Sequence, residues 1–151
     1  MEYDSREDTL KHIERVQYLI CGVRSILELR GLDHDASKLA PPEKEAFDRC
    51  TPKLKGTTYG TPEYKTACRE LGPALEHHHK HNSHHPQYYP NGINGMSLID
   101  LLEMLCDWKA AGERQADGSD IRKSLEHNRE RFAMSDEVYG ILAVTVKQLG
   151  W

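Results

Sequence analysis

The sequence predicts an all-α protein, a single HD-like bundle of five to seven helices in one domain over residues 1–151. Apolar residues recur at spacings of three and four along every long segment, which is the period of an amphipathic helix. Strand-like alternation of apolar and polar residues is nearly absent, and turn-forming residues separate the periodic segments. A chain of 151 residues can bury a core of its own without disulfides or a structural metal.

The first predicted helix covers residues 5–30. Ser5 and Asp8 have the spacing of a capping box, and Gly31 is a natural helix stop. One face of this helix carries Leu10, Ile13, Val16, Ile20, Val23 and Leu27. The segment LDHDASKLAPPE then leads into a second helix over residues 42–50, and residues 51–61 have the Gly, Thr and Pro content of an exposed loop.

A third helix is predicted to begin at Pro62 or Glu63, with a kink at Gly72-Pro73. Its inward face carries Tyr64, Ala67, Cys68, Leu71, Leu75 and His78. Residues 83–96, SHHPQYYPNGINGM, contain too much Pro, Gly and Asn for regular structure.

A fourth helix is predicted from the N-cap residue Ser97 to about residue 111. Its inward residues are expected to be Leu98, Leu101, Leu102, Leu105 and Trp108. Two further helices follow at about 119–132 and 136–149, the second capped by Ser135. These segments complete the predicted bundle.

The composition limits the class of protein. Charged residues make up 29% and hydrophobic residues 38%, as in globular domains, and the formal charge is -4. An acidic balance offers no surface for duplex nucleic acid, although a local basic pocket for a small phosphate ligand is compatible with it. The sequence lacks a signal peptide and any run of about 18 apolar residues, so a cytoplasmic protein without a membrane partner is expected.

Four cysteines are present, and none forms a CxxC pair. Cys21 and Cys106 lie in apolar helical stretches, where buried free thiols are expected. A disulfide framework is the alternative.

The strongest local feature is the dipeptide His34-Asp35, between the first two predicted helices. Imidazole and carboxylate together suit divalent manganese, iron, cobalt, nickel or zinc. Adjacent side chains at a helix start diverge by about 100° around the axis, so the pair can address one ion or two neighbouring ions. Alone, the pair is more typical of an aspartate helix cap beside a surface histidine.

Two distant residues extend this pattern. His12 lies one position from the apolar face of the first helix, and Asp107 lies inside LLEMLCDWKAA. A carboxylate in such a stretch must be paired, bound to metal or at the surface, because an unpaired buried charge is very costly. A half-buried histidine and a surface aspartate are the ordinary alternatives. Together the residues give the order His, His-Asp, Asp on successive helices.

This order resembles the HD-domain superfamily of metal-dependent phosphohydrolases. The segment HDASK is similar to the HDxGK segment of the HD-GYP branch, whose lysine faces substrate phosphate, and HHP followed by Asn91-Gly92 is similar to that branch's HHE…DG segment. More narrowly, HDASK, HxxxNxHHP and EMLCDW resemble a family of short HD-like proteins of phages and bacteria. The resemblance covers about residues 8–132. It implies a metal site formed by His12, His34, Asp35 and Asp107, with Lys38 binding phosphate.

The sequence also departs from that branch. Ser37 stands at the glycine position of HDxGK, and the GYP triplet is absent. The resemblance therefore implies the ligands and the lysine, and it does not imply a cyclic dinucleotide substrate.

Six of the nine histidines fall within residues 77–85. A two-metal site needs about three imidazoles beyond the one-metal set, and the predicted additional ligands are His78, His84 and His85. His78 continues the inward face of the third helix, and Pro86 holds the turn that follows. The remaining members, His77, His79 and His81, are expected in solvent or behind the ligands. Adventitious metal capture by the whole cluster is the alternative.

The resemblance implies hydrolysis of a phosphoric ester or anhydride by water activated at one or two divalent ions, magnesium included. Asp35 and Lys38 are the predicted catalytic residues. The expected substrate is a small phosphorylated molecule, most simply a nucleotide, contacted by Lys38, Asn82 and Tyr88. Three alternatives remain: an HD-type di-iron oxygenase, a nucleotide-binding or inhibitor protein without turnover, and a structural or metal-buffering protein. A homo-oligomer is compatible with the sequence.

Overall fold

The computed structural model describes residues 3–55, 57, 60–114 and 120–151. These residues form seven α-helices and three short 3₁₀ helices, and no strand occurs among them, so the predicted all-α class is confirmed. The chain divides into two compact units, Met1–His34 and Asp35–Trp151, which are described separately below. The single domain expected over residues 1–151 stays a prediction.

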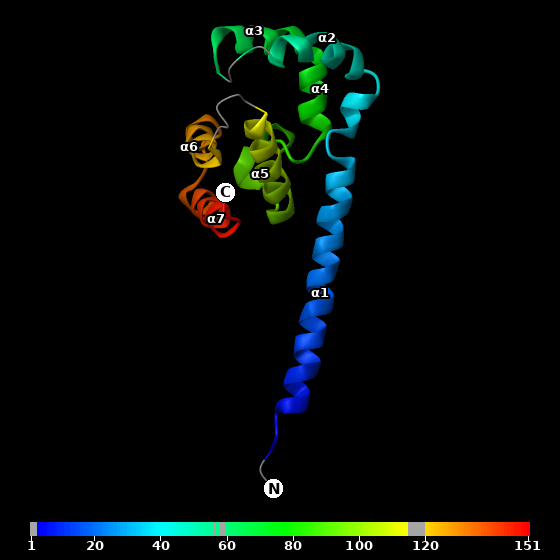
Figure 1. Ribbon diagram of the computed structural model, residues 1–151, viewed down its shortest axis with the longest axis vertical. Helices are drawn as coiled ribbons and strands as arrows, with labels where there is room; N and C mark the ends of the chain where they lie inside the picture. Colours follow the sequence, from blue (N-terminus) through cyan, green and yellow to red (C-terminus); the bar gives the residue numbers. More distant parts are fainter. Residues whose placement is uncertain (1–2, 56, 58–59, 115–119) are drawn as a thin grey trace. The chain divides into compact units, whose positions relative to one another are not determined.

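The first unit consists of α1 (Arg6–Asp33), the blue helix in Figure 1. Ser5 occupies the N-cap position, but its side chain accepts no capping hydrogen bond from the backbone, so the predicted capping box with Asp8 is wrong. Acidic residues in the first turn favour the helix start through the dipole instead. The helix also continues through Gly31, since one glycine in a helix costs only about 1 kcal/mol. It ends at Asp33, and His34 follows as the C-cap residue with φ -52° and ψ 126°.

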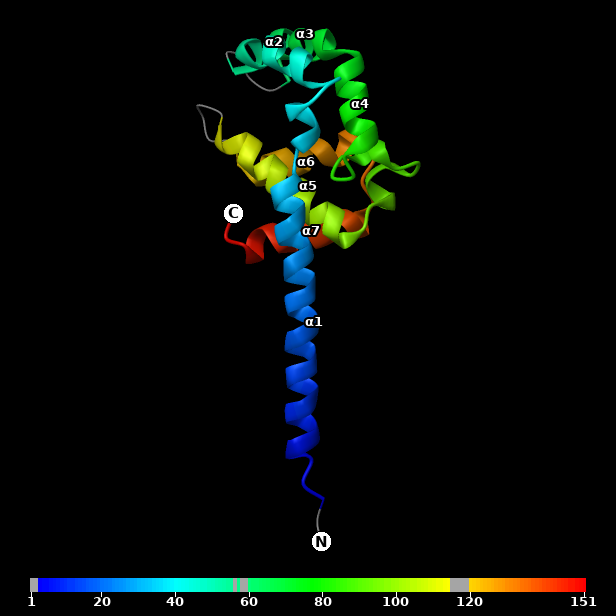
Figure 2. The same ribbon diagram turned by 90° about the vertical axis from the view of Figure 1, so that its right-hand side faces the viewer.

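The second unit begins with four elements: the 3₁₀ helix η1 (Ala36–Leu39), α2 (Lys44–Lys55), α3 (Pro62–Leu71) and α4 (Pro73–His81). Helices α2 and α3 lie side by side in both views (Figures 1 and 2). The predicted loop is wrong for residues 51–55, which continue α2 through Pro52; residues 56, 58 and 59 lie outside the described part. Packing of α2 on α3 outweighs the helix-breaking preference of proline.

The expected kink at Gly72-Pro73 is a complete break between α3 and α4. Gly72 has φ 43° and ψ -119°, a backbone conformation that favours glycine. Pro73 then occupies the first turn of α4, where its missing N–H costs nothing. The turn leaves Leu71 and His78 both buried.

The rest of the second unit contains η2 (Pro86–Tyr88), η3 (Gly92–Gly95), α5 (Leu98–Glu113), α6 (Ile121–Arg131) and α7 (Asp136–Gln148). The segment predicted to be irregular therefore holds two short 3₁₀ helices. The predicted caps Ser97 and Ser135 both accept hydrogen bonds from the backbone, and Ser97 forms a capping box with Asp100. Residue 119, the predicted start of the fifth predicted helix, lies outside the described residues, and Asp120 caps the corresponding helix α6.

The hydrophobic core lies between α5, α6 and α7. Its buried members are Ile93, Leu101, Met104, Leu105, Ile121, Leu125, Met134, Leu142 and Val146. Leu98, expected to face inward, is 60% exposed because the first residue of α5 lies at the edge of this core. All four cysteines are free, and Cys21 and Cys106, expected to be buried, are exposed. None of the described helices combines the length and apolar character of a membrane span.

Candidate metal centre

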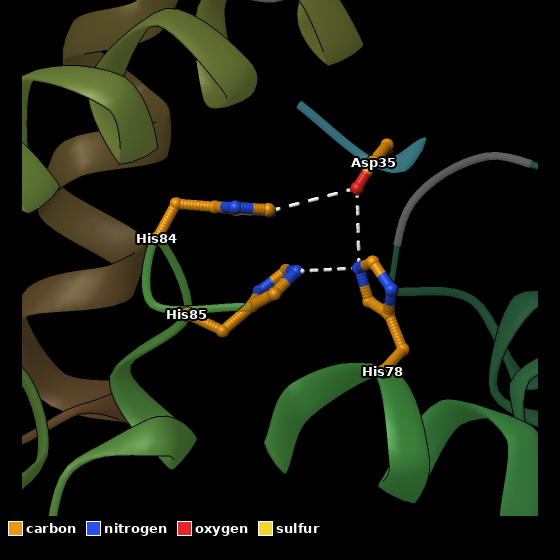
Figure 3. Close-up of side chains that lie close together, drawn as sticks. All are labelled: Asp35, His78, His84 and His85. Atoms are coloured by element: carbon orange, nitrogen blue, oxygen red, sulfur yellow. Dashed lines mark hydrogen bonds and ion pairs between the residues drawn. The ribbon is translucent and has the colours of Figure 1, made fainter. Parts of the chain in front are cut away.

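Four side chains of the second unit converge on one point: Asp35, His78, His84 and His85 (Figure 3). We call these residues the Asp35 cluster. Asp35 Oδ1 lies 3.1 Å from Nε2 of His78 and 3.6 Å from Nε2 of His84. The Nε2 atoms of His78 and His85 lie 2.9 Å apart. One ligand atom from each residue lies within 4.8 Å of all the others.

Local backbone structure brings these side chains together. Asp35 precedes η1 in the left-handed conformation, with φ 59° and ψ 11°. This conformation is uncommon outside glycine, and such outliers concentrate at functional sites. His78 is buried in the last turn of α4, and His84 and His85 lie in the short connection between α4 and η2. Pro86 at the start of η2 restricts the backbone after His85.

Glu43, the residue before α2, lies behind His78 with a fully buried side chain. Its carboxylate lies 2.9 Å from Nδ1 of His78 and 2.8 Å from Nδ1 of His77, and it accepts a hydrogen bond of 2.9 Å from the Ser37 hydroxyl. Burial opposes ionisation of Glu43, but these donors lower the pKa of its carboxyl group below the usual value. Glu43 is therefore an ionised carboxylate that accepts hydrogen bonds from its neighbours.

The hydrogen bonds around Glu43 assign a proton to Nδ1 of His78. The Asn82 amide uses its two N–H groups on the backbone oxygen of His78 and on the Ser37 hydroxyl, at 2.8 and 3.0 Å. Ser37 uses its single proton on Glu43. Neither neighbour has a proton left for His78 Nδ1, and the carboxylate only accepts. The ring must therefore donate from Nδ1, which leaves a lone pair on Nε2 in the neutral imidazole.

His84 has the same arrangement on the opposite side of the cluster. Its Nδ1 lies 3.1 Å from a carboxylate oxygen of Glu103 on α5, and its Nε2 faces Asp35. A carboxylate behind the ring assigns the proton to Nδ1 here as well. Such carboxylate–histidine pairs orient metal-binding imidazoles and raise their basicity.

The donor set fits a divalent transition metal ion. Lone pairs of two imidazoles and a carboxylate oxygen face one another, and only a proton or a cation between them removes their repulsion. For ligand bonds of about 2.1 Å, neighbouring tetrahedral ligands lie about 3.4 Å apart. The separations of 2.9, 3.1 and 3.6 Å in the cluster bracket that value. Three imidazoles and one carboxylate suit zinc, manganese, iron, cobalt or nickel.

Lys38 is the cationic neighbour of the cluster. Its ammonium donates a hydrogen bond of 2.6 Å to Asp35 Oδ2 and lies 5.0 Å from the centre of the Phe47 ring. Burial opposes ionisation of Asp35, but the charge of Lys38 and its hydrogen bond lower the pKa of the Asp35 carboxyl group below the usual value. Asp35 is thus a carboxylate with one oxygen toward Lys38 and the other toward the imidazoles.

His85 of the cluster and its neighbour His79 are held in the neutral form. Burial is the main cause that lowers the pKa of His85 to about 2 and that of His79 to about 4. The His79 ring packs against the His85 ring at 4.7 Å between centroids. Neutral imidazole is the form that binds metal ions.

The remaining predicted ligands are placed as follows. Asp107 on α5 offers a carboxylate oxygen within 4.8 Å of a ring nitrogen of His84, so it adjoins the cluster. His12 lies on α1 and His34 follows its last residue, both in the first unit. The roles of His12 and His34 as ligands stay predictions.

The other predicted site residues lie around the cluster. Asn82 supports His78 and Ser37 through its hydrogen bonds. Tyr88 is exposed at the end of η2, with its ring against Tyr89. The substrate contacts of both residues stay predictions. His77 donates to Glu43, as expected of a residue behind the ligands, and the exposed His81 stacks on His77.

Three supporting residues, Ser37, Glu43 and Glu103, were not predicted from the sequence. Ser37 stands out in the sequence only because it occupies the glycine position of HDxGK. Glu43 and Glu103 lie in charged or amphipathic segments where a glutamate is ordinary, and no local pattern indicates that they are buried behind imidazoles. The EMLCDW motif does contain Glu103 and was the one available signal.

A family model matches residues 1–149, nearly the whole chain, and its description is a family of unknown function (DUF5662). No protein of curated function and no solved structure matches the chain.

Proposed function

The chain belongs to the DUF5662 family, and we propose that it is a metal-dependent phosphohydrolase acting on a small phosphorylated molecule. One observation carries the proposal: two imidazoles, each with a carboxylate behind it, present their Nε2 atoms to Asp35, beside a lysine. A divalent ion held by Asp35, His78, His84 and His85 would supply Lewis-acid chemistry, lowering the pKa of water and polarising a phosphoryl oxygen. One or two ions, with Asp107 as a further ligand, are compatible with this proposal.

The residues of the chain have separate tasks in this proposal. Glu43 and Glu103 keep the Nε2 lone pairs of His78 and His84 directed into the centre. Lys38, whose side chain is 29% exposed, donates a hydrogen bond to a phosphoryl oxygen and so offsets its negative charge. Asp35 and Lys38 are the proposed catalytic residues.

The resemblance to the HD-domain superfamily supports the same proposal, with a nucleotide as the proposed substrate and Asn82 and Tyr88 as further contacts. We place the activity in the cytoplasm, which is the host cytoplasm if the protein belongs to a phage. All four cysteines are free, two of them are exposed, and exposed thiols persist in reducing compartments.

Metal analysis followed by a screen for phosphate release tests the proposal. The purified protein should contain a transition metal ion and release phosphate from nucleotides or 4-nitrophenyl phosphate with manganese, cobalt, nickel, zinc or magnesium added. Asp35→Asn should not retain the metal, because the neutral amide lacks the charge of the carboxylate. Its turnover should fall by at least about a hundred-fold. Asp136→Asn, a charge change on the surface of α7, should keep both.

Three results would contradict the proposal. Protein that takes up no metal lacks the proposed centre. Iron-loaded protein that consumes oxygen and releases no phosphate is an oxygenase. Metal-loaded protein that binds nucleotides without turnover is a binding protein.

A further inference from the structure

A groove of about 570 Å³ adjoins the Asp35 cluster along α2. It is lined by Lys38, Phe47, Asp48, Thr51, Pro52 and Lys55. Sites for small molecules commonly measure about 300–1,000 Å³, and a phosphate group alone needs far less. The groove therefore has room for a substantial part of a molecule besides a phosphate.

Two lining residues connect the groove to the cluster. Lys38 lines the groove and donates to Asp35 Oδ2 at 2.6 Å. Phe47 lines it as well, and its ring lies 5.8 Å from the ring of His78 in an edge-on arrangement. A molecule with its phosphate at Lys38 would thus have the rest of its atoms beside the groove.

The far end of the groove carries a second cation. Lys55 is the last residue of α2, eight residues after Phe47, which corresponds to about 12 Å along a helix. Thr51 and Pro52 lie three and four residues after Asp48, and Lys55 lies four and three residues after them, so all four share one face of α2. The carboxylate of Asp48 pairs with Lys44, which does not line the groove. The groove is therefore lined by one lysine beside the cluster, Lys38, and by a second at the end of α2, Lys55, with the Phe47 ring and Pro52 among its other lining residues.

We propose that the groove binds the part of the substrate remote from the reacting phosphate, and that this part carries a second anionic group bound by Lys55. The inference rests on the proposed function and narrows its substrate class. The substrate has a phosphate ester at the Lys38 end, a flat or apolar middle against Phe47 and Pro52, and a carboxylate or second phosphate at the Lys55 end.

A pair of matched probes tests the second anionic group. 4-Carboxyphenyl phosphate and 4-carbamoylphenyl phosphate have the same ring and nearly the same size, and only the first carries a negative charge opposite the phosphate. Calorimetric titration of the full-length protein should give a dissociation constant three- to five-fold lower for the carboxylate probe. The gain is small because Lys55 is exposed and its charge is screened, and it should shrink as salt is raised.

Variants of α2 assign this difference to Lys55. Lys55→Gln should bind both probes equally, and Lys55→Glu should reverse the preference. Lys53→Gln is the matched control, because Lys53 lies on the same helix and pairs with Glu70 of α3. It should keep the wild-type preference.

Binding and hydrolysis are measured separately, so the two proposals fail separately. Three results would overturn the groove assignment, even if both probes were hydrolysed. They are equal affinity of the wild-type protein for both probes, no binding of either probe, and a preference that survives in Lys55→Gln. If the preference depends on Lys55 but neither probe releases phosphate, the groove assignment stands and the phosphohydrolase proposal fails.

Discussion

Glu43 is the residue on which the candidate centre depends most strongly. A carboxylate with no exposed surface is costly unless several donors satisfy it, and Glu43 has His77, His78 and Ser37 around it. Those donors offset the cost of burying the charge. In return, the carboxylate assigns the Nδ1 proton of His78 and so the direction of its Nε2 lone pair.

Replacement of Glu43 by glutamine tests this role. The N–H groups of the new side-chain amide would donate to Nδ1 of His78 and favour a proton on Nε2, which removes the lone pair proposed to bind metal. We expect Glu43→Gln to weaken metal affinity by about 10- to 100-fold in a chelator competition titration. Glu45→Gln, on the exposed side of α2, should leave the affinity unchanged. Equal affinities for Glu43→Gln and the wild type would reject the orienting role.

Lys38 makes a different contribution, since it neutralises charge rather than orienting a ligand. We expect Lys38→Ala to lower phosphohydrolase turnover ten-fold or more, about 1.4 kcal/mol in transition-state stabilisation, with metal content nearly unchanged. Steady-state kinetics and metal analysis measure the two effects, and Lys80→Ala on the exposed side of α4 is the control. Wild-type turnover in Lys38→Ala would weaken the case for a phosphorylated substrate.

At the scale of elements, the turn between α3 and α4 determines where His78 lies. Gly72 allows the chain to leave α3 with a positive φ and to start α4 at once, so His77 and His78 reach Glu43. A continuous helix through residue 72 would direct the later residues elsewhere.

Two glycine substitutions should therefore have opposite effects on stability. Gly72→Ala should lower the free energy of unfolding by about 1 kcal/mol or more, because alanine is strained at φ 43°. Gly140→Ala should raise it by up to about 1 kcal/mol, because Gly140 lies inside α7 and an added Cβ would meet nothing within 4 Å. Urea denaturation measures both changes. A stabilised Gly72→Ala variant would show that the turn does not require glycine.

At the scale of the whole molecule, the Asp35 cluster joins three separate segments of the second unit. Asp35 precedes η1, His78 belongs to α4, and His84 and His85 lie beyond it. A metal ion bound by all of them would link these segments in the folded state only. Stability should then depend on metal concentration.

Thermal unfolding with and without metal tests this linkage. At about a hundred-fold excess over the dissociation constant, the ion should add about 2.7 kcal/mol, which raises the melting temperature by about 5–10 °C in a chain of this size. Chelator should reverse the shift, and Asp35→Asn should show almost none. An identical melting temperature in zinc or manganese and in chelator would argue against a bound ion in the cluster.

The sequence by itself determined the helices and most of the chemistry-bearing residues. Helical periodicity and caps such as Ser97 and Ser135 act within a few residues of the chain, so they can be recognised locally. Asp35, His78 and the His84-His85 pair could also be singled out as candidates, since their residue types are typical of metal ligands.

Only the tertiary structure decided which neighbours those residues meet. Pro52 lies inside α2 because α2 packs on α3, against the local preference of proline. Glu43 supports His78 across 35 positions of sequence, and Glu103 supports His84 from another helix. The tautomer of each imidazole depends on these remote carboxylates, because a proton is assigned by the acceptor that faces it in space and not by the residues beside it in the chain.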